Sequence, residues 1–492
     1  MLLHLRITMN ILKPFALSLA IFLPFYLSAC QTLTNTTPQN THNTPKTQQL
    51  RLFQDIKKHK LDNGLTVIIK EDRRAPVVMT QIWYGVGAND EPVGKGGLSH
   101  FLEHLMFKDT PKVSGDEFSQ LISHYGGNNN AYTNADVTVY HEILPANRYP
   151  LALELEANRM KNILFKPEQI QSERQVIQEE RRVRTDDNPM AKAFETWRAF
   201  IYKDTPRAHP VIGSMADINN LSMDDLQNWY QTWYVPNNAT LVIVGDVDSD
   251  DALAWVKKYF GQIPKGAKTP PRTPAQFIHA DDIFVGQGGI NERTITIYEP
   301  VKVPSIILAW QVPSLSSLRL SGHDNPKTQR ELLALGLFDD VLSGGGSSRF
   351  AKNLIKNNKV TSVSASYQGT SYGDGLFVVG ITPKAGSSLD DTKQLVLDEI
   401  KRTMTDPITQ KELDRSFIAL KTALVFASEG VSGQAQILGE LHHNNISFEQ
   451  IQQELDTMPT ITADEIKNAG KKYLTDERMY TAYILPTDKD EQ

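Results

Sequence analysis

Two histidines and one glutamate stand at a spacing that could bind a metal ion. They are His100, Glu103 and His104, in the run Gly96-Gly97-Leu98-Ser99-His100-Phe101-Leu102-Glu103-His104. Apolar residues at helical spacing around them predict a buried helix that the glycine pair opens. Residues four apart share one helix face, so both imidazoles can reach one metal, and Glu103 projects close to that face. Because a lone histidine on an apolar helix face is usually an ordinary core residue, a third ligand is needed.

A carboxylate is available on a second predicted helix, over residues 167–184, with Pro167 in its first turn. Glu173 and Glu180 are two helical turns apart and therefore stack on one face of it. Glu180 follows His104 by 76 residues (180 − 104). Two histidine nitrogens and one carboxylate are a ligand set that leaves the fourth position of a tetrahedral zinc open to water.

This arrangement resembles the pitrilysin/insulinase family of zinc metallopeptidases, the inverzincins, which carry His-x-x-Glu-His followed by a helix with Glu-x6-Glu. The likeness is closest to mitochondrial processing peptidase and its bacterial relatives. It extends over roughly residues 51 to 486. The blocks that carry it besides the helices are 96–108, 130–133, 138–140 and 234–246.

The resemblance implies one Zn²⁺ per chain, with His100, His104 and Glu180 as its ligands. Glu103 is then the general base that takes a proton from the zinc-bound water and passes it to the leaving amine. Glu173 is expected to orient a ligand and is the second candidate catalytic residue.

The resemblance also implies a substrate-binding strand. Asn130, Ala131 and Tyr132 lie in a segment that, in the family, pairs with an extended substrate beside the zinc, which is strand addition. The alternative is a simple edge strand with no such role.

The elements that must position these residues are predicted from periodicity and turn signals. Ser114 and Glu117 form a capping box, and Asp62-Asn63-Gly64 is a turn signal. The predicted strands are 65–69, 77–86, 130–144 and 239–244, and the predicted helices are 98–106, 114–125, 147–163, 167–184 and 221–234.

A repeat indicates that the chain of 492 residues is a duplication. Residues 221–248 align without gaps to 461–488, an offset of 240 (461 − 221). The prediction is an α+β fold of two homologous α/β-sandwich domains, each a mostly antiparallel sheet with helices packed on one face. The predicted boundaries are 51–262 for the zinc-binding domain, 263–290 for a linker with the Pro-rich run 268–274, and 291–488 for the second domain.

The second domain has no His-x-x-Glu-His. Its run Gly344 to Phe350 resembles the family's Gly-rich turn before a helix, and no P-loop lysine follows it, so it is weak evidence for phosphate binding. His442 and His443 are predicted to be an exposed pair rather than a ligand site.

The first residues predict a targeting segment. Residues 1–29 have a basic start and a short apolar stretch and read as a signal peptide, and Cys30 after Leu27-Ser28-Ala29 resembles the lipid-bearing cysteine of bacterial lipoproteins. A plain signal peptide with an incidental cysteine is the alternative. Residues 30–50 read as a flexible tether. The expected location is the bacterial cell envelope, on the outer membrane facing the periplasm.

The net charge of −6 without a basic block makes nucleic acid an unexpected partner.

The expected function is that of a zinc endopeptidase cutting peptides or unfolded protein segments. A catalytically silent scaffold or a binding lipoprotein of the same fold is the alternative. Active family members carry an Arg and a Tyr, seven apart, after the Gly-rich turn, and residues 353–363 offer neither. The favoured interpretation is a heterodimer with a homologous subunit that has Arg and Tyr but no zinc motif. A self-sufficient chain or homodimer using Lys356 or Tyr367 is the alternative.

Overall fold

The computed structural model describes residues 54–273 and 293–487. The predicted signal peptide, Cys30, the tether and part of the linker lie outside these residues. Among the helices of the described ranges, none is both long enough and apolar enough to span a membrane.

The first half of the chain forms a six-stranded sheet in the order β1-β2-β6-β3-β5-β4. Only β2 and β6 run parallel, and the other neighbours are antiparallel. The strands are β1 (Ile56–Lys60), β2 (Thr66–Glu71), β3 (Val77–Tyr84), β4 (Asn128–Thr133), β5 (Thr138–Pro145) and β6 (Ala239–Gly245). The helices are α2 (Leu98–Leu105), α3 (Gly115–His124), α4 (Tyr149–Asn162), α5 (Pro167–Arg181), α6 (Pro189–Ile201), α7 (Met215–Asn220), α8 (Met223–Trp233) and α9 (Ser249–Phe260).

The second half forms a five-stranded sheet in the order β7-β11-β8-β10-β9, again with one parallel pair, β7 and β11. Its strands are β7 (Thr294–Glu299), β8 (Ser305–Val312), β9 (Ser362–Tyr367), β10 (Gly375–Thr382) and β11 (Met479–Pro486). Its helices are α11 (Leu315–Leu320), α12 (Pro326–Ser343), α13 (Leu389–Thr405), α14 (Gln410–Ala427), α15 (Val431–His443), α16 (Phe448–Thr457) and α17 (Ala463–Tyr473).

The predicted duplication is confirmed by this topology. The second sheet repeats the strand order and the single parallel pair of β2-β6-β3-β5-β4. Adding the offset of 240 to the bounds of α8 gives 463–473, which are the bounds of α17, and adding it to the start of β6 gives the start of β11. The α+β class with mostly antiparallel sheets is therefore confirmed. The domain boundaries themselves stay a prediction.

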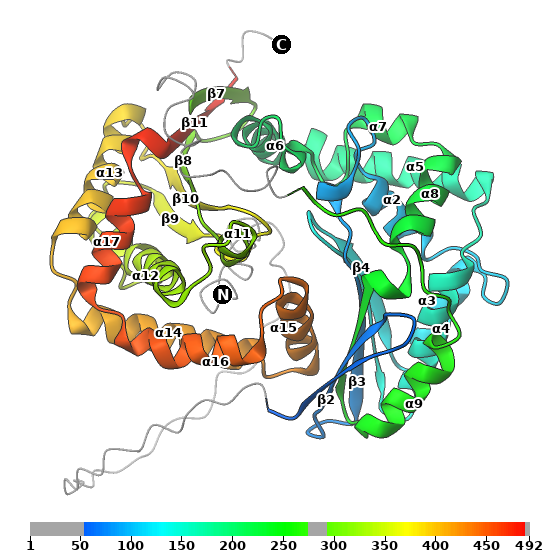
Figure 1. Ribbon diagram of the computed structural model, residues 1–492. Coiled ribbons are helices and arrows are strands. Elements are labelled where there is room, and N and C mark those ends of the chain that lie inside the picture. Colours follow the sequence, from blue (N-terminus) through cyan, green and yellow to red (C-terminus); the bar gives the residue numbers. More distant parts are fainter. Residues whose placement is uncertain (1–53, 274–292, 488–492) are drawn as a thin grey trace, which may run out of the picture.

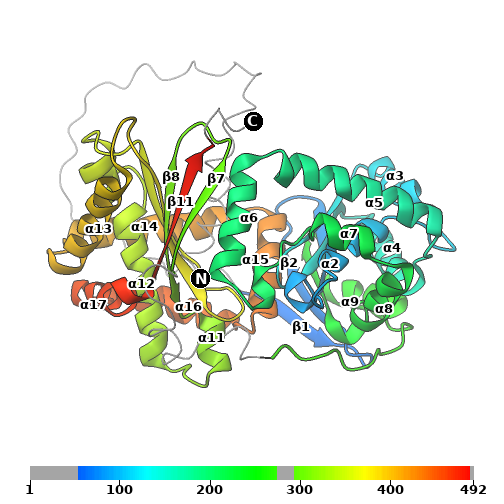
Figure 2. The ribbon, with the colours of Figure 1, turned by 90° about the horizontal axis from the view of Figure 1, so that it is seen from above.

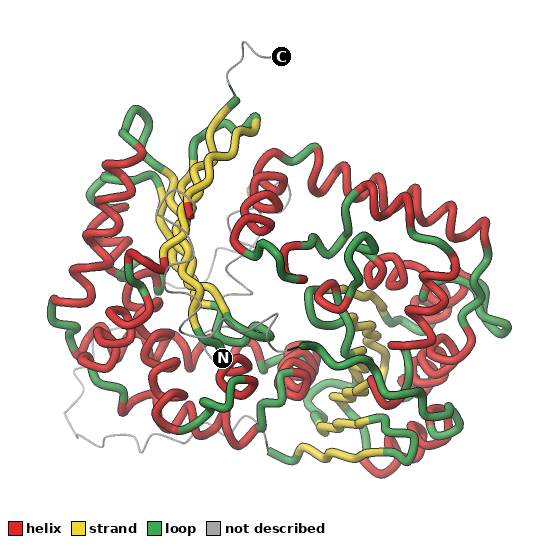
Figure 3. The backbone as a smooth tube through the Cα atoms, turned by 45° about the horizontal axis from the view of Figure 1, so that its top comes forward, coloured by secondary structure: helices red, strands yellow, loops and turns green. Residues whose placement is uncertain are grey.

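Each half packs most of its helices on one face of its own sheet, and one helix of the other half covers the opposite face. Figure 3 shows the two sheets toward the middle of the molecule with most helices on the outer sides. Between the sheets lie α6 and α15 (Figures 1 and 2). Helix α6 contributes Ala193 and Trp197 to a core with Ile307 of the second sheet, whereas Ala435 and Leu438 of α15 pack on the first sheet. The two halves thus exchange corresponding helices.

The prediction of one long strand over 130–144 is wrong. The segment is a hairpin, in which β4 and β5 pair antiparallel from Thr133 opposite Thr138. The side chain of Asn134 accepts hydrogen bonds from the backbone N–H groups of Asp136 and Val137 and so closes the turn. Strand β4 lies at the edge of the sheet, as the sequence suggested.

Candidate metal centre

The helix that carries both histidines starts at a tight approach of two backbone segments. Gly97 has φ +87°, and a Cβ there would lie 2.6 Å from the carbonyl oxygen of Ile212, so only glycine fits. The buried carboxylate of Glu91 accepts hydrogen bonds from the backbone N–H groups of Gly97 and Ser99, two of the unpaired donors of the first turn of α2. Burial raises the pKa of Glu91 to about 8. These contacts fix where α2 begins and hence the direction in which His100 points.

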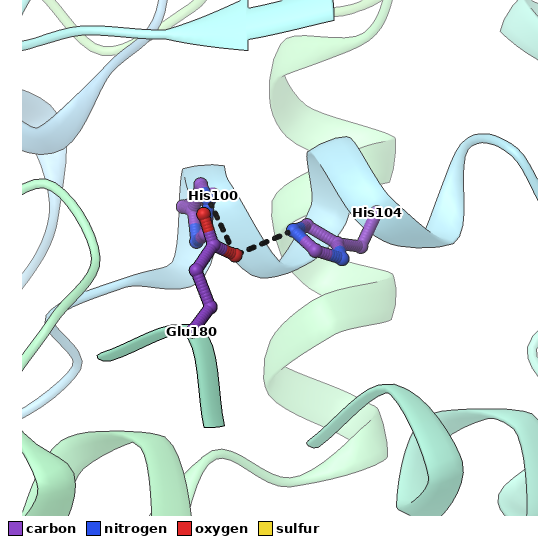
Figure 4. A group of neighbouring side chains, drawn as sticks. All are labelled: His100, His104 and Glu180. Carbon is purple, nitrogen blue, oxygen red and sulfur yellow. Dashed lines mark ion pairs between the residues drawn. The ribbon is translucent and has the colours of Figure 1, made fainter. Parts of the chain in front are cut away.

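The three predicted ligands come together. Figure 4 shows His100 and His104 on one helix with Glu180 reaching toward both. Glu180 Oε2 lies 3.7 Å from His100 Nε2 and 3.3 Å from His104 Nε2, and one ligand atom from each residue lies within 4.8 Å of the others. In a tetrahedral zinc site with bonds of about 2.0–2.1 Å, neighbouring donor atoms are about 3.4 Å apart. The donor set and its spacing therefore fit zinc.

Glu173 contacts the candidate ligand His104 at the ring nitrogen that does not face Glu180. Its Oε2 lies 3.1 Å from His104 Nδ1, and its Oε1 forms an ion pair with Lys108. Burial alone would raise the pKa of Glu173, but the hydrogen bonds from His104 and Lys108 lower it overall. An ionised Glu173 accepts a hydrogen bond from Nδ1–H of His104, which leaves Nε2 as the metal-binding nitrogen. Glu173 therefore lies where a carboxylate that orients His104 would stand, and that role stays a prediction.

The two histidines differ in protonation. Burial, together with the nearby His104, lowers the pKa of His100 to about 4. Burial opposes protonation of His104 as well, yet the hydrogen bonds to Glu173 and Glu180 raise the pKa of His104 to about 9. Hydrogen bonding to His104 is also the main cause that lowers the pKa of Glu180. The metal-free site therefore holds a proton that a bound cation has to displace.

Glu103 lies in the same cavity and is held by the edge strand. The hydroxyl of Thr133 on β4 donates to Glu103 Oε2 at 2.6 Å. Burial raises the pKa of Glu103, and this hydrogen bond partly offsets the rise. The cavity measures about 490 Å³, and every residue lining it falls within 100–184: His100, Glu103, His104, Phe107, Lys108, Asn130, Ala131, Tyr132, Thr133, Glu173, Glu180 and Arg184. The predicted substrate-binding residues 130–132 thus lie beside the candidate ligands.

Four lining residues were not singled out from the sequence: the apolar Phe107 and three polar or charged side chains. Thr133, Lys108 and Arg184 each contact a carboxylate of the site. Arg184 sits in a π-helical turn (182–186) that prolongs α5, and its guanidinium, 73% exposed, pairs with Glu180 Oε1. Glu179, by contrast, points outward, is 64% exposed and pairs with Arg182. The spacing of Arg184 four residues after Glu180 was the available signal for this pair.

The second half carries no matching site among the residues that the structure describes. The offset of 240 places Leu413 and Leu420 where α5 has Glu173 and Glu180, and both leucines belong to the second hydrophobic core. The prediction that His442 and His443 are exposed is wrong. Both are partly buried in another cavity, where α15 meets the first sheet, and burial lowers the pKa of each to about 4.

Comparisons with known proteins agree with this architecture. The family model described as "Insulinase (Peptidase family M16)" matches residues 66–214, and that described as "Peptidase M16 inactive domain" matches residues 220–420. The "Zinc protease PqqE" of Helicobacter pylori is 27% identical over 434 residues, which are 87% of this chain and 92% of that protein. The "Mitochondrial-processing peptidase subunit beta" of Lentinula edodes is 26% identical over 423 residues, 85% and 87% of the two chains.

A solved structure shows the same fold. The crystal structure of a protease from Helicobacter pylori matches with a TM-score of 0.78 at 24% identity, over 88% of this chain and 99% of that one. The two family models together match well over half of the chain, one after the other along the sequence. The resemblance inferred from the residues is therefore confirmed, and the chain belongs to the insulinase family of peptidases, peptidase family M16.

Proposed function

We propose that the protein is a zinc-dependent endopeptidase that hydrolyses peptides or unfolded protein segments, with Glu103 as its general base. One observation carries the proposal: the Glu103 carboxylate opens into the cavity that holds the three candidate ligands and is fixed there by Thr133. A zinc ion bound by His100, His104 and Glu180 would supply Lewis acidity toward water and the scissile carbonyl. The zinc proteases among the relatives support this assignment.

Residues of the chain itself would bind the substrate and transfer the proton. Edge strand β4 offers backbone groups to an extended peptide, which would hold the scissile bond along the cavity beside residues 130–132. With Oε2 engaged by Thr133, Glu103 keeps its other oxygen to receive a proton from water and to return it to the departing nitrogen. Burial raises the pKa of Glu103 and so makes it a stronger base than a solvated carboxylate.

The competing function is a silent scaffold of the same fold. It is separated from a peptidase by comparing the wild-type chain with Glu103→Gln, both loaded with zinc and offered an unfolded polypeptide. The substitution keeps the size of the side chain and removes its ability to accept a proton. A peptidase loses turnover in the variant, whereas a scaffold has none to lose.

We also propose that the active form is a heterodimer. No residue of the second half lines the cavity in the described part of the chain, which leaves the groups that the family's second half supplies to the substrate carbonyl for a partner to provide. The two residues that could replace the missing Arg and Tyr in cis are engaged: Tyr367 is 3% exposed and donates to the carbonyl of Pro313, and Lys356 donates to the carbonyl of Gly346. The similarity to a protein named as a subunit supports the presence of a partner. The family resemblance is what suggests that this partner carries the Arg and Tyr and lacks a zinc motif.

The site of action is a separate proposal, drawn from the sequence of the first 50 residues. We propose that Cys30 carries the lipid and anchors the enzyme in the bacterial cell envelope, on the outer membrane facing the periplasm, with residues 30–50 as the tether. The support is the sequence Leu27-Ser28-Ala29-Cys30 after a short apolar stretch.

A further inference from the structure

A helix of the second half contacts the edge strand beside the metal centre. The amide of Gln436 on α15 donates from Nε2 to the hydroxyl oxygen of Tyr132 on β4 at 2.8 Å. A second hydrogen bond from the same amide, to Glu440 one turn on, fixes the orientation of the Gln436 side chain. The contact joins residues 304 positions apart, in the half with the candidate ligands and the half without them.

The packing around this contact is close. The ring of Tyr132 stands edge-on to the indole of Trp83, with centroids 6.3 Å apart and planes at 89°. Trp83 in turn lies against the backbone of α15, where a Cβ at Gly439 would come within 2.1 Å of the indole. Burial raises the pKa of Tyr132, so its hydroxyl stays a neutral phenol that can accept from Gln436. Helix α15 thus contacts Tyr132 directly through Gln436 and packs against Trp83, which in turn contacts the ring of Tyr132.

The next residue of β4, Thr133, is hydrogen-bonded to the proposed general base, Glu103. Thr133 follows Tyr132 directly, and its hydroxyl donates to Glu103. A short strand held at one residue by α15 and at the next by the base has little freedom to shift when an extended chain is added along its open edge. These contacts therefore fix the position of the β4 backbone, where the substrate would add, relative to the carboxylate of Glu103.

We infer that Gln436 is a positioning residue, through which the second half of the chain sets the place of β4 for substrate. The inference rests on the proposed function, because β4 receives substrate only if the protein is a peptidase. Gln436 touches neither the candidate ligands nor the cavity and acts through Tyr132.

The test replaces Gln436 by leucine and uses Gln434→Leu as its control. Gln434 stands on the same helix and also bonds across the halves, from its Nε2 to Asp72 Oδ2 at 2.7 Å, away from β4. Gln436→Leu leaves the partly buried Tyr132 hydroxyl without its donor, so KM for an unfolded polypeptide rises roughly five- to tenfold while zinc affinity is unchanged. Gln434→Leu leaves KM within about twofold of the wild type. Equal effects of the two variants, or none in Gln436→Leu, overturn the inference.

A double variant separates positioning from general loosening. Tyr132→Phe removes the hydroxyl and keeps the ring against Trp83, so Tyr132→Phe combined with Gln436→Leu raises KM no further than either change alone. Additive effects of the two changes contradict a shared contact.

A measurement that does not depend on peptidase activity tests the role of Gln436 separately from the proposed function. Amide hydrogen exchange over residues 128–133 is faster in Gln436→Leu than in the wild type and in Gln434→Leu. If the wild type proves to have no peptidase activity, the proposed function fails, and the exchange of β4 still decides whether α15 holds this strand.

Discussion

Glu173 Oε2 lies 3.1 Å from Nδ1 of His104, on the side of the ring opposite the nitrogen that faces Glu180. The two glutamates of α5 thus act on the two nitrogens of one imidazole. Glu173 fixes the tautomer and the plane of the ring, and Glu180 shares with it the candidate metal site. The seven-residue spacing that the sequence displays is what places the two carboxylates one behind and one in front of His104.

Glu173→Ala is expected to weaken zinc binding about 10- to 100-fold, because His104 loses the acceptor that orients it. The measurement is zinc affinity by competition with a chelator. Glu179→Ala is the matched control, since Glu179 stands on the same helix and pairs with Arg182 at the surface. Equal losses of zinc affinity in both variants would show that the effect comes from a change in the helix and not from the lost contact to His104.

Zinc affinity is expected to rise with pH. The pKa of His104 is about 9 without metal, so at pH 6 to 8 the ring carries a proton that zinc must displace. His100, with a pKa of about 4, is already neutral and releases none. Affinity then increases about tenfold per pH unit from 6 toward 9, and about one proton is released per zinc bound at pH 6. Calorimetry in buffers of different ionisation enthalpy measures that proton. An affinity independent of pH in this window contradicts the assignment.

Thr133→Val is expected to lower kcat about 10- to 100-fold without loss of zinc, because Glu103 loses a hydrogen bond to its charged carboxylate. Thr133→Ser keeps the hydroxyl and should stay within roughly threefold of the wild type. Steady-state kinetics with parallel metal analysis measures both. Valine and serine variants of equal activity would mean that the hydroxyl does not hold the base.

The isolated, zinc-loaded chain is expected to show little proteolysis, because no side chain of its described second half reaches the cavity. Adding a homologous subunit with the Arg and Tyr should restore turnover by orders of magnitude. The assay follows cleavage by the chain alone and after titration with the partner. Full activity of the chain alone would exclude the heterodimer.

Much of the site could be predicted because it is encoded locally. The spacing of His100, His104 and Glu180 within two helices determines which faces meet, once the helices pack. The duplication was equally readable, since α8 and α17 keep one register over an unbroken stretch.

What the sequence did not reveal depends on turns and on long-range packing. Thr133 and Thr138 belong to strands of similar composition, so the Asn134 turn between them was interpreted as more strand, although Asn-Ala-Asp was an available turn signal. The partial burial of His442 and His443 and the contact of Gln436 with Tyr132 arise because α15 crosses to the other half. No local pattern specifies which sheet such a helix covers.

The central claim is tested most directly by the cleavage of an unfolded polypeptide by the zinc-loaded wild type and Glu103→Gln, each with the Arg- and Tyr-bearing partner present. Both proteins should bind one zinc with similar affinity, because the three candidate ligands are untouched. Turnover by the variant should fall at least about a hundredfold, as expected on removal of a general base. Equal turnover by the two zinc-loaded proteins would contradict the account.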